Sequence, residues 1–384
     1  MPPLRIAYLC DMPPSDRNIY SGGNARIFDA LKDHADSVTV LPQDWGAAEP
    51  LRQAILKTST GMNMRLRWRA HYALRGIIAR RVQRALHAGT YDVLFGTYAL
   101  HAMAGVTAPK GMVTAFTADA LQSVFRESVL GTHHEQRLIG RAMNGWVERR
   151  EREALQGLDL GLWPSEWLRD AVEARYNLPA DVSHVVEWGA NIPPPPAPGP
   201  RSLSSSVRLL VIGRDWFAKG GPTAFDTMQI LRARGVDARL TVIGCIPPER
   251  YRSDHVTVHP QLNKAVPAEL ATFQNALSEA HFLVMPSFES YGFAFCEASA
   301  YGLPALCLRV GGVPVREGEN GHALPPGSGP EDFADIIATY HAAPERYADL
   351  SRSARKVYEQ RLNWDAWARR STALMRQAVA EKRS

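Results

Sequence analysis

Short apolar runs rich in β-branched residues alternate along this chain with longer stretches in which apolar residues recur at helical spacing. In the first half, the short runs span residues 4–9, 37–41, 92–95, 112–116, 158–163 and 184–188. Alternation of buried strands with amphipathic helices is typical of a parallel sheet whose crossover helices cover both faces. The first half is therefore predicted to form a doubly wound α/β domain.

A stretch rich in proline and serine interrupts this pattern between residues 192 and 206. Such a stretch forms neither a helix nor a central strand. Beyond it the pattern restarts, with short runs at residues 207–213, 239–244, 255–258, 281–285 and 305–308. We predict two Rossmann-like α/β domains, residues 1–191 and 207–364, joined by a linker at 192–206 and facing one another across a cleft.

The last stretch of the chain, from residue 351 onwards, has the pattern of a helix. Trp364 and Trp367 are spaced to share one helix face. In a two-domain protein, a helix at about residues 365–384 could cross back to the first domain. Packing of the two tryptophans in a core explains them equally well, so the sequence leaves both interpretations open.

Composition narrows the classes of function. No apolar run approaches the ~18 residues that a membrane-spanning helix needs, and no basic leader precedes the first run. We therefore expect a soluble, cytoplasmic protein. The four cysteines lie far apart, without CxxC or Cys/His spacing, which predicts reduced thiols and no structural zinc. The net charge of +5 is too small to indicate nucleic-acid binding by itself.

Candidate chemistry is richest in the loop after the run at 281–285. Ligands of open parallel sheets bind beyond the carboxyl ends of the strands. Here Glu289 lies in a polar loop, Gly292 precedes a short helix from Phe293 to about Tyr301, and Glu297 lies about one turn inside it. A helix N-terminus after a glycine binds anions. A carboxylate beside it suits a sugar linked to a phosphate, because sugar hydroxyls donate to carboxylates. A solvated Glu289 and a Glu297 stabilised by the helix dipole are the alternative.

Three further loops that follow predicted strands contain candidate residues. Arg214 and Lys219, after the run at 207–213, could neutralise a diphosphate, with Asp215 as a competing partner. In the first domain, Gly22 and Gly23 at a helix start permit close backbone approach to a ligand, or form only a flexible turn. Asp119, after the run at 112–116, is a candidate for binding hydroxyls or for capping a helix.

Several common signatures are absent from the sequence. It contains no GxxxxGK[ST], GxGxxG, HExxH or GxSxG, which removes the usual NTPase, dinucleotide, metalloprotease and hydrolase motifs. It also lacks the Asp-x-Asp pair that commonly holds a divalent cation against a diphosphate. We expect no metal and no cofactor.

With these motifs the chain resembles the retaining glycosyltransferases of the GT-B fold, in the family 4 group. Glu289 and Glu297 look like that family's EX7E motif, residues 213–220 like its donor-phosphate loop, and Gly22-Gly23 like its N-terminal glycine loop. The resemblance implies that Glu289 contacts the transferred sugar and Glu297 the ribose. It implies that the diphosphate is bound by the side chains of Arg214 and Lys219 and by the backbone of Tyr291, Gly292 and Phe293.

The implied reaction is metal-independent transfer of a sugar from a nucleoside-diphosphate sugar to a hydroxyl of a saccharide or lipid-linked acceptor, with retention of configuration. Synthesis of a cell-surface polysaccharide or glycolipid is the expected setting. Two alternatives stay open: an epimerase or phosphorylase of the same fold that acts on sugar phosphates, and a catalytically silent scaffold that binds nucleotide sugars. The donor base, the donor sugar and the acceptor cannot be read from the sequence.

One segment departs from the ordinary charge balance. Residues 51–91 contain nine lysines or arginines and no acidic residue, with apolar residues near helical spacing. A basic amphipathic helix can lie on an anionic membrane, which would bring the protein to the inner face of a membrane and to lipid-linked acceptors. Arginines on a solvated helix face are the alternative.

Overall fold

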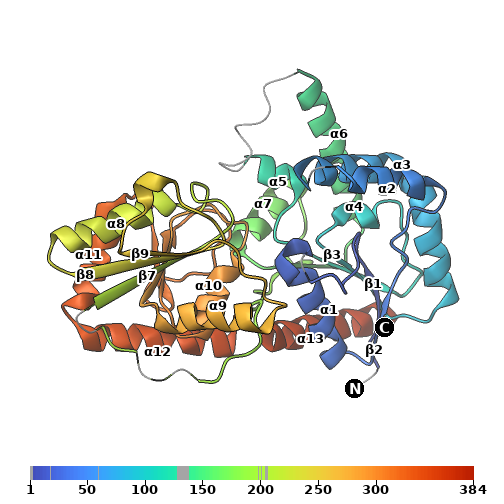
Figure 1. The fold of residues 1–384 in the computed structure, drawn as a ribbon. Coiled ribbons are helices and arrows are strands. Elements are labelled where there is room, and N and C mark those ends of the chain that lie inside the picture. The colour runs from blue at the N-terminus through green and yellow to red at the C-terminus, as the bar shows by residue number, and fades with distance from the viewer. Residues whose placement is uncertain are drawn as a thin grey trace. The chain divides into compact units, whose positions relative to one another are not determined.

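The computed structural model describes residues 3–17, 19–58, 60–127, 138–197, 199, 201–203 and 206–384. The chain forms two compact units: unit 1 comprises Met1–Glu187 and Trp367–Ser384, and unit 2 comprises Trp188–Ala366. Each unit contains one six-stranded sheet in which all strand pairs are parallel, with helices against it (Figure 1). The predicted fold class, two parallel α/β sheets, is confirmed.

Unit 1 has the strand order β2-β1-β3-β4-β5-β6. Its strands are β1 (Arg5–Leu9), β2 (Ser37–Val40), β3 (Val93–Thr97), β4 (Val113–Thr117), β5 (Leu160–Trp163) and β6 (Ser183–Val185). Its helices before the last one are η1 (Ile19–Gly22), α1 (Gly23–His34), η2 (Gly46–Ala48), α2 (Glu49–Leu56), α3 (Thr60–Ala88), α4 (Leu100–Met103), α5 (Gln122–Glu127), α6 (Leu138–Leu155) and α7 (Glu166–Tyr176).

The central strands β3 and β4 are buried along their whole length, as expected for strands covered on both faces. Apolar residues of α3, α4, α5 and α7 pack over one face of the sheet, while α1 and α13 (Trp364–Arg383) lie on the other (Figure 1). This burial supplies most of the free energy that holds unit 1 together.

Unit 2 has the strand order β12-β11-β10-β7-β8-β9. Its strands are β7 (Ser206–Ile212), β8 (Asp237–Ile243), β9 (Val256–His259), β10 (Phe282–Met285), β11 (Ala305–Leu308) and β12 (Gly321–Leu324). Its helices are α8 (Gly221–Ala233), η3 (Glu249–Tyr251), α9 (Pro267–Glu279), α10 (Phe293–Ala300), α11 (Pro330–His341) and α12 (Pro344–Gln360). Helices α8 and α11 cover one face, and α9, α10 and α12 lie on the other (Figure 1).

Two details differ from the sequence-based prediction. The predicted run at 184–188 ends as a strand at Val185. Strand β12 was not predicted, because only four residues, Gly-His-Ala-Leu, form it. Gly321 lies so close to β11 that a Cβ there would stand 1.8 Å from the carbonyl oxygen of Ala305. A short strand that begins with glycine carries almost no periodic signal.

The helix α13 begins among residues of unit 2 and continues as part of unit 1. Trp364 donates from Nε1 to Asn191 Oδ1 at 3.2 Å and contacts the ring of Trp188, with centroids 6.2 Å apart. The ring of Trp367 is buried and meets Phe95 of β3 edge-on. The two tryptophans thus pack in different surroundings, although one turn of helix separates them.

Candidate active site

The strand order of unit 2 contains one point at which the chain changes direction across the sheet. From β7 it moves outward through β8 and β9, and it then returns to β10 on the opposite side of β7. The loops after β7 and β10 therefore begin side by side and lead away in opposite directions. Open α/β sheets bind ligands in the crevice at such a point, beyond the carboxyl ends of the strands. Residues 213–220 and 286–292 form these two loops.

The two loops are joined by an ion pair between predicted site residues. Lys219 Nζ donates to Glu289 Oε1 at 2.5 Å, and the Ser287 hydroxyl donates to the same oxygen at 2.7 Å. The Glu289 side chain is 13% exposed and that of Lys219 is 27% exposed, so the pair is only partly accessible to water. The structure thus places a carboxylate and an ammonium group together where the fold favours a ligand.

Glycines allow three loops to converge on Glu289. A Cβ on Gly220, whose φ is +72°, would stand 2.5 Å from the Pro286 ring. A Cβ on Gly311, whose φ is +68°, would stand 2.1 Å from the Glu289 carbonyl oxygen, which also accepts a hydrogen bond from Gly312 N–H at 3.0 Å. The backbone of Glu289 is therefore held by the loop after β11, and a side chain at either glycine would push the loops apart.

The N-terminus of α10 lies directly after Glu289 in the chain. Gly292, in the left-handed region with φ of +89°, caps it without a side-chain hydrogen bond. The Tyr291 hydroxyl donates to the Trp188 carbonyl oxygen at 2.6 Å, and the Phe293 ring stacks on Trp188. The buried Tyr291 and Trp188 and the half-buried Phe293 fix the start of the helix from inside unit 2. The positive end of its dipole adds to the Lys219 charge beside Glu289.

Glu297 and Arg214 are placed apart from that pair. Glu297 lies one turn into α10, its side chain is 3% exposed, and its Oε1 accepts a hydrogen bond from Lys264 Nζ at 2.5 Å. Arg214 is exposed after β7 and forms no ion pair within the part of the chain that the structure describes. Asp215, its predicted competitor, accepts hydrogen bonds from the backbone of Phe217 and Ala218 instead, at 2.9 Å each. The Arg214 charge is thus left for solvent or a ligand.

Unit 1 has its own change of direction, between β1 and β3. A buried cluster that the sequence did not reveal lies there. The Asp11 carboxylate accepts a hydrogen bond from the Tyr20 hydroxyl at 2.9 Å and pairs with Arg67 at 3.0 Å, and His101 Nε2 lies 3.3 Å from it. One signal was available: Asp11 lies two residues after the end of the first strand, at the edge where ligands bind.

Electrostatics fixes the charges in this cluster. Burial raises the pKa of Asp11, but the interaction with the nearby His101 ring and the charge of Arg67 outweigh it and hold the pKa well below its usual value. Burial lowers the pKa of His101, and Asp11 only partly offsets this. The cluster at pH 7 therefore contains an ionised Asp11, a charged Arg67 and a neutral histidine.

The backbone beside this cluster is strained. Tyr20, Ser21 and Tyr98 have φ of 52°, 54° and 56°, in the left-handed region of the backbone that residues other than glycine rarely adopt. The rings of Tyr20 and Tyr98 stack with centroids 4.3 Å apart. Gly22, also left-handed, precedes α1, which begins at Gly23. Strained residues of this kind gather at functional sites.

Asp119 lies after β4, between that strand and α5. Burial raises the pKa of Tyr98, and the negative charge of Asp119 raises it further, which places Asp119 near the strained loop. The first-domain residues named from the sequence, Gly22, Gly23 and Asp119, thus belong to one edge of the unit 1 sheet. The close approach of Gly22 and Gly23 to a ligand and the acceptor-side role of Asp119 stay predictions.

Among the described residues, no three side chains of His, Cys, Asp or Glu are grouped so that they could hold a metal ion. In the same part of the chain, no helix is both long enough and apolar enough to cross a membrane. All four cysteines are buried, and burial raises the pKa of the Cys10 thiol to about 12. A thiolate at Cys10 is therefore not available for chemistry at neutral pH.

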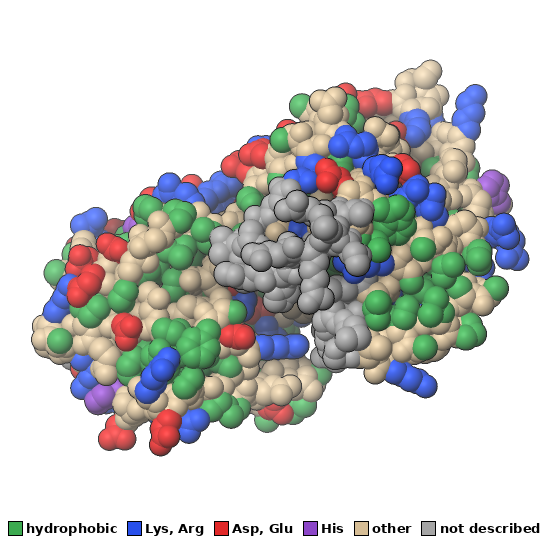
Figure 2. Space-filling view, turned by 90° about the horizontal axis from the view of Figure 1, so that it is seen from above, with side chains coloured by type: hydrophobic (Ala, Val, Ile, Leu, Met, Phe, Trp, Pro, Cys, Tyr) green, Lys and Arg blue, Asp and Glu red, His purple; other side chains and the backbone are tan. Residues whose placement is uncertain are grey.

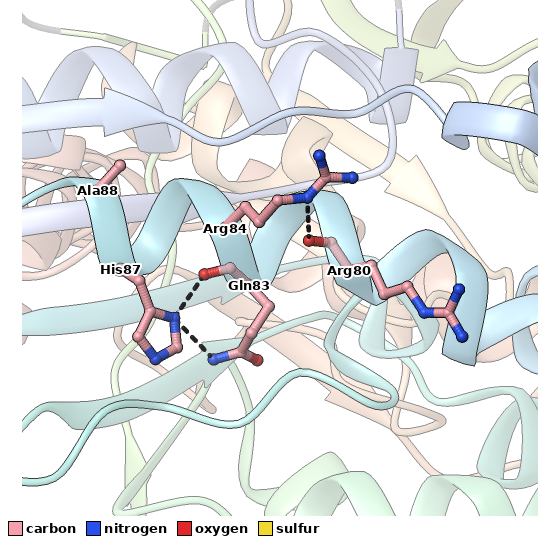
Figure 3. Close-up of a pocket in the computed structure, with 5 residues that line it drawn as sticks. All are labelled: Arg80, Gln83, Arg84, His87 and Ala88. Atoms are coloured by element: carbon pink, nitrogen blue, oxygen red, sulfur yellow. Dashed lines mark hydrogen bonds between the residues drawn. The ribbon is translucent and has the colours of Figure 1, made fainter.

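The structure divides the basic segment into buried and exposed charges. Arg52 and Arg67 are buried and paired with acids, and Arg81 pairs with Asp44 at 3.0 Å. Arg80 and Arg84 are exposed on α3 and border a shallow hollow with Gln83, His87 and Ala88 (Figure 3). Basic and apolar side chains lie side by side on the surface of unit 1 (Figure 2), and Leu66 and Ile77 of α3 are each 41% exposed.

The known proteins that this chain resembles are glycosyltransferases. Residues 206–342 match the family described as "Glycosyl transferases group 1". The chain is 28% identical over 229 residues to a D-inositol 3-phosphate glycosyltransferase of Arthrobacter sp. (strain FB24), which covers 52% of this chain and 51% of that protein. The chain therefore spans about half the length of the curated relatives it matches, or less.

Two solved structures share the fold over almost the whole chain. A glycosyltransferase from Rickettsia africae ESF-5 superposes with a TM-score of 0.62 at 11% identity, covering 99% of both chains. The apo form of the lipopolysaccharide outer core galactosyltransferase WaaB gives a TM-score of 0.62 at 15% identity, covering 97% of this chain and 99% of that one. The GT-B fold class predicted from the sequence is thereby confirmed.

Proposed function

We propose that this protein is a retaining glycosyltransferase that moves a sugar from a nucleoside-diphosphate sugar to a hydroxyl acceptor without a bound metal. The observation that carries the proposal is the Lys219–Glu289 pair at the change of direction of the unit 2 sheet, beside the N-terminus of α10. The family match over residues 206–342 covers this site and supports the proposal.

Charge complementarity suggests how the donor would be bound. A diphosphate next to Glu289 would be repelled unless a cation stood between them, and Lys219, which pairs with Glu289, would supply that cation. Arg214, exposed and without an ion pair among the described residues, adds a second positive charge, and the backbone amides of residues 291–293 add hydrogen-bond donors. Glu289 would then accept hydrogen bonds from the sugar hydroxyls, and Glu297 from the ribose.

The chemistry needs no separate general base. The bond between the anomeric carbon and the phosphate oxygen breaks, leaving an oxocarbenium-like sugar and a nucleoside diphosphate. The acceptor hydroxyl attacks from the face that the phosphate leaves, and its proton passes to the departing phosphate oxygen. The products are a glycoside of unchanged configuration and a nucleoside diphosphate. Arg214, Lys219 and the α10 N-terminus stabilise the charge on the leaving group.

The acceptor would bind at the carboxyl edge of the unit 1 sheet. Tyr20, Gly22, Gly23 and Asp119 lie along this edge, and the buried Asp11 cluster fixes the loop that carries Tyr20. A polyhydroxylated acceptor, either a saccharide or a lipid-linked one, fits a site that offers a carboxylate and stacked tyrosine rings. D-inositol 3-phosphate, for which the curated relatives are named, belongs in the acceptor screen.

A peripheral membrane contact through residues 51–91 would bring the protein to lipid-linked acceptors at the inner face of a membrane. The exposed Leu66 and Ile77, with Arg80 and Arg84 further along α3, supply the apolar and cationic groups. Flotation with vesicles tests this part. Binding to vesicles that contain an acidic lipid, abolished by salt or by replacing Arg80 and Arg84 with glutamate, supports it. Absence of salt-sensitive binding refutes it.

Donor identification is the first test of the proposed function. A thermal-shift screen against UDP-, GDP- and ADP-sugars should show one donor class that raises the melting temperature. Turnover with that donor is then followed by nucleotide release, and the product's configuration is read by NMR. Lys219→Ala should reduce kcat about a hundredfold, as for the loss of other preorganised charges of this kind. Lys356→Ala, at an exposed lysine on α12, is the matched control.

Each result has a defined meaning. A product of inverted configuration, or full activity of Lys219→Ala, refutes the proposed mechanism. Conversion of the donor sugar without any acceptor indicates an epimerase. Donor binding without release of nucleotide, even to water, indicates a silent binding scaffold.

A further inference from the structure

We propose that Lys264 is a positioning residue, which orients the Glu297 carboxylate so that its second oxygen accepts a hydrogen bond from a ribose hydroxyl of the donor. This inference rests on the proposed function, because it concerns how the donor nucleoside is recognised. Lys264 belongs to the loop between β9 and α9, whereas Glu297 lies on α10. The two residues meet at the carboxyl edge of the unit 2 sheet.

The contacts of Lys264 fix both ends of its side chain. Its Nζ donates to Glu297 Oε1 at 2.5 Å and lies 4.2 Å from the centroid of the Phe273 ring. Its loop is tied by hydrogen bonds of Asn263, which donates from its backbone N–H to the Glu269 carboxylate at 2.6 Å and accepts from Ala265 N–H at 3.0 Å. The ammonium group is therefore held in place by a folded loop and an aromatic ring.

Glu297 is the less accessible of the two glutamates. Its side chain is 3% exposed, and in the described part of the chain the only hydrogen bond to its carboxylate comes from Lys264, on Oε1. An unpaired buried carboxylate is strongly unfavourable, so Lys264 provides the compensation for burying it. Oε2 retains its capacity to accept, and a carboxylate can only accept, which selects a ligand that donates from hydroxyl groups.

The two lysines of the site differ in what they can touch. Lys219 pairs with Glu289 beside the α10 N-terminus, where the diphosphate is proposed to lie. Removing the Lys219 side chain should therefore affect the chemical step. Lys264, in the loop between β9 and α9, pairs with Glu297, which lies about one helical turn into α10 and is proposed to bind the ribose. Removing the Lys264 charge should therefore weaken donor binding and leave the turnover of bound donor unchanged.

The test uses the full chain and the nucleoside diphosphate that the donor screen identifies. Affinities for the ribose form and for its 2′- and 3′-deoxy analogues are measured by calorimetry, and KM and kcat by nucleotide release. The wild type should bind at least one deoxy analogue about tenfold more weakly, the usual effect of one hydrogen bond to a charged group. Lys264→Met, which keeps the stem over Phe273, should reduce that ratio towards one and raise the donor KM with kcat unchanged. Lys264→Arg should restore part of the ratio, and Lys356→Met should behave as wild type.

A second pair of variants guards against misfolding. The double variant Lys264→Met with Glu297→Gln leaves no buried charge, and it should match Glu297→Gln alone in ribose preference. The inference is overturned if Lys264→Met keeps the ribose preference of the wild type, or if the double variant differs from Glu297→Gln in ribose preference. A wild type that binds no nucleoside diphosphate at all overturns the proposed function instead, so the two failures are distinguishable.

Discussion

Asp11→Asn tests the buried cluster of unit 1. The side chains of Asp11, Arg67 and His101 are 1%, 6% and 4% exposed, so water screens none of them effectively. The variant keeps the shape and one acceptor oxygen but removes the charge that compensates Arg67. Breaking a buried ion pair from one side costs about 3–5 kcal/mol. Since Arg67 also contacts Asn63 Oδ1 and Met12 Sδ, each at 3.3 Å, we expect the lower end, about 3 kcal/mol.

The assay is thermal unfolding followed by calorimetry. For a unit of roughly 200 residues, a loss of about 3 kcal/mol lowers the melting temperature of unit 1 by about 6–12 °C. Asp29→Asn is the matched control, because its partner Arg17 lies 2.8 Å away in a pair whose side chains are 43% and 59% exposed. That exposed pair should contribute less than about 1 kcal/mol.

Two observations would refute this reasoning. The first is an Asp11→Asn variant as stable as the wild type at pH 7. The second is a double variant, Asp11→Asn with Arg67→Met, that is no more stable than the single one, since removing both charges should recover part of the loss. The pKa of Asp11 is held below its unfolded value, so its contribution is present above about pH 4 and falls as the pH is lowered further.

Two further predictions concern unit 2. Burial lowers the pKa of His281 to about 4, so the free energy of unfolding should be unaffected by this group above about pH 6.5 and should fall by about 3 kcal/mol as the pH is lowered to 4. The His281→Asn variant, followed by urea unfolding, should lack this decline. A variant with the same pH profile as the wild type would contradict the prediction. Gly311→Ala should displace Glu289 and reduce turnover at least about tenfold. Gly235→Ala, also at a left-handed position but with no atom within 4 Å of its Cβ, should lose only about 1–2 kcal/mol of stability and keep full activity.

The loops that are proposed to bind the donor could be identified from sequence because their signal is local. A strand, a polar loop, a glycine and a short helix follow one another within about twenty residues, and this order places Glu289 and the start of α10 at the carboxyl edge of the sheet. What the sequence could not supply was the order of strands. That β10 lies next to β7 follows only from the topology, and it decides that Lys219 meets Glu289 while Arg214 stays exposed.

The missed residues are those whose partners are distant in the chain. Asp11, Arg67 and His101 come from the loop after β1, from α3 and from α4, and no spacing between them is diagnostic. Lys264 lies in a loop without a recognisable motif, and its contact with Glu297 depends on how α9 and α10 follow their strands. Such contacts are set by tertiary packing, to which periodicity and motif spacing are blind.

The helix α13 also governs the order in which the protein can be completed on the ribosome. Unit 1 needs Trp367 against Phe95, and it needs Lys382 and Arg383 to pair with Asp159 and Asp92, yet these residues are synthesised after the whole of unit 2. Unit 2, although it begins second, is the first whose residues are all available. Until these residues are synthesised, part of the apolar surface of the nascent unit 1 stays uncovered. Chaperones have most opportunity to bind during this interval.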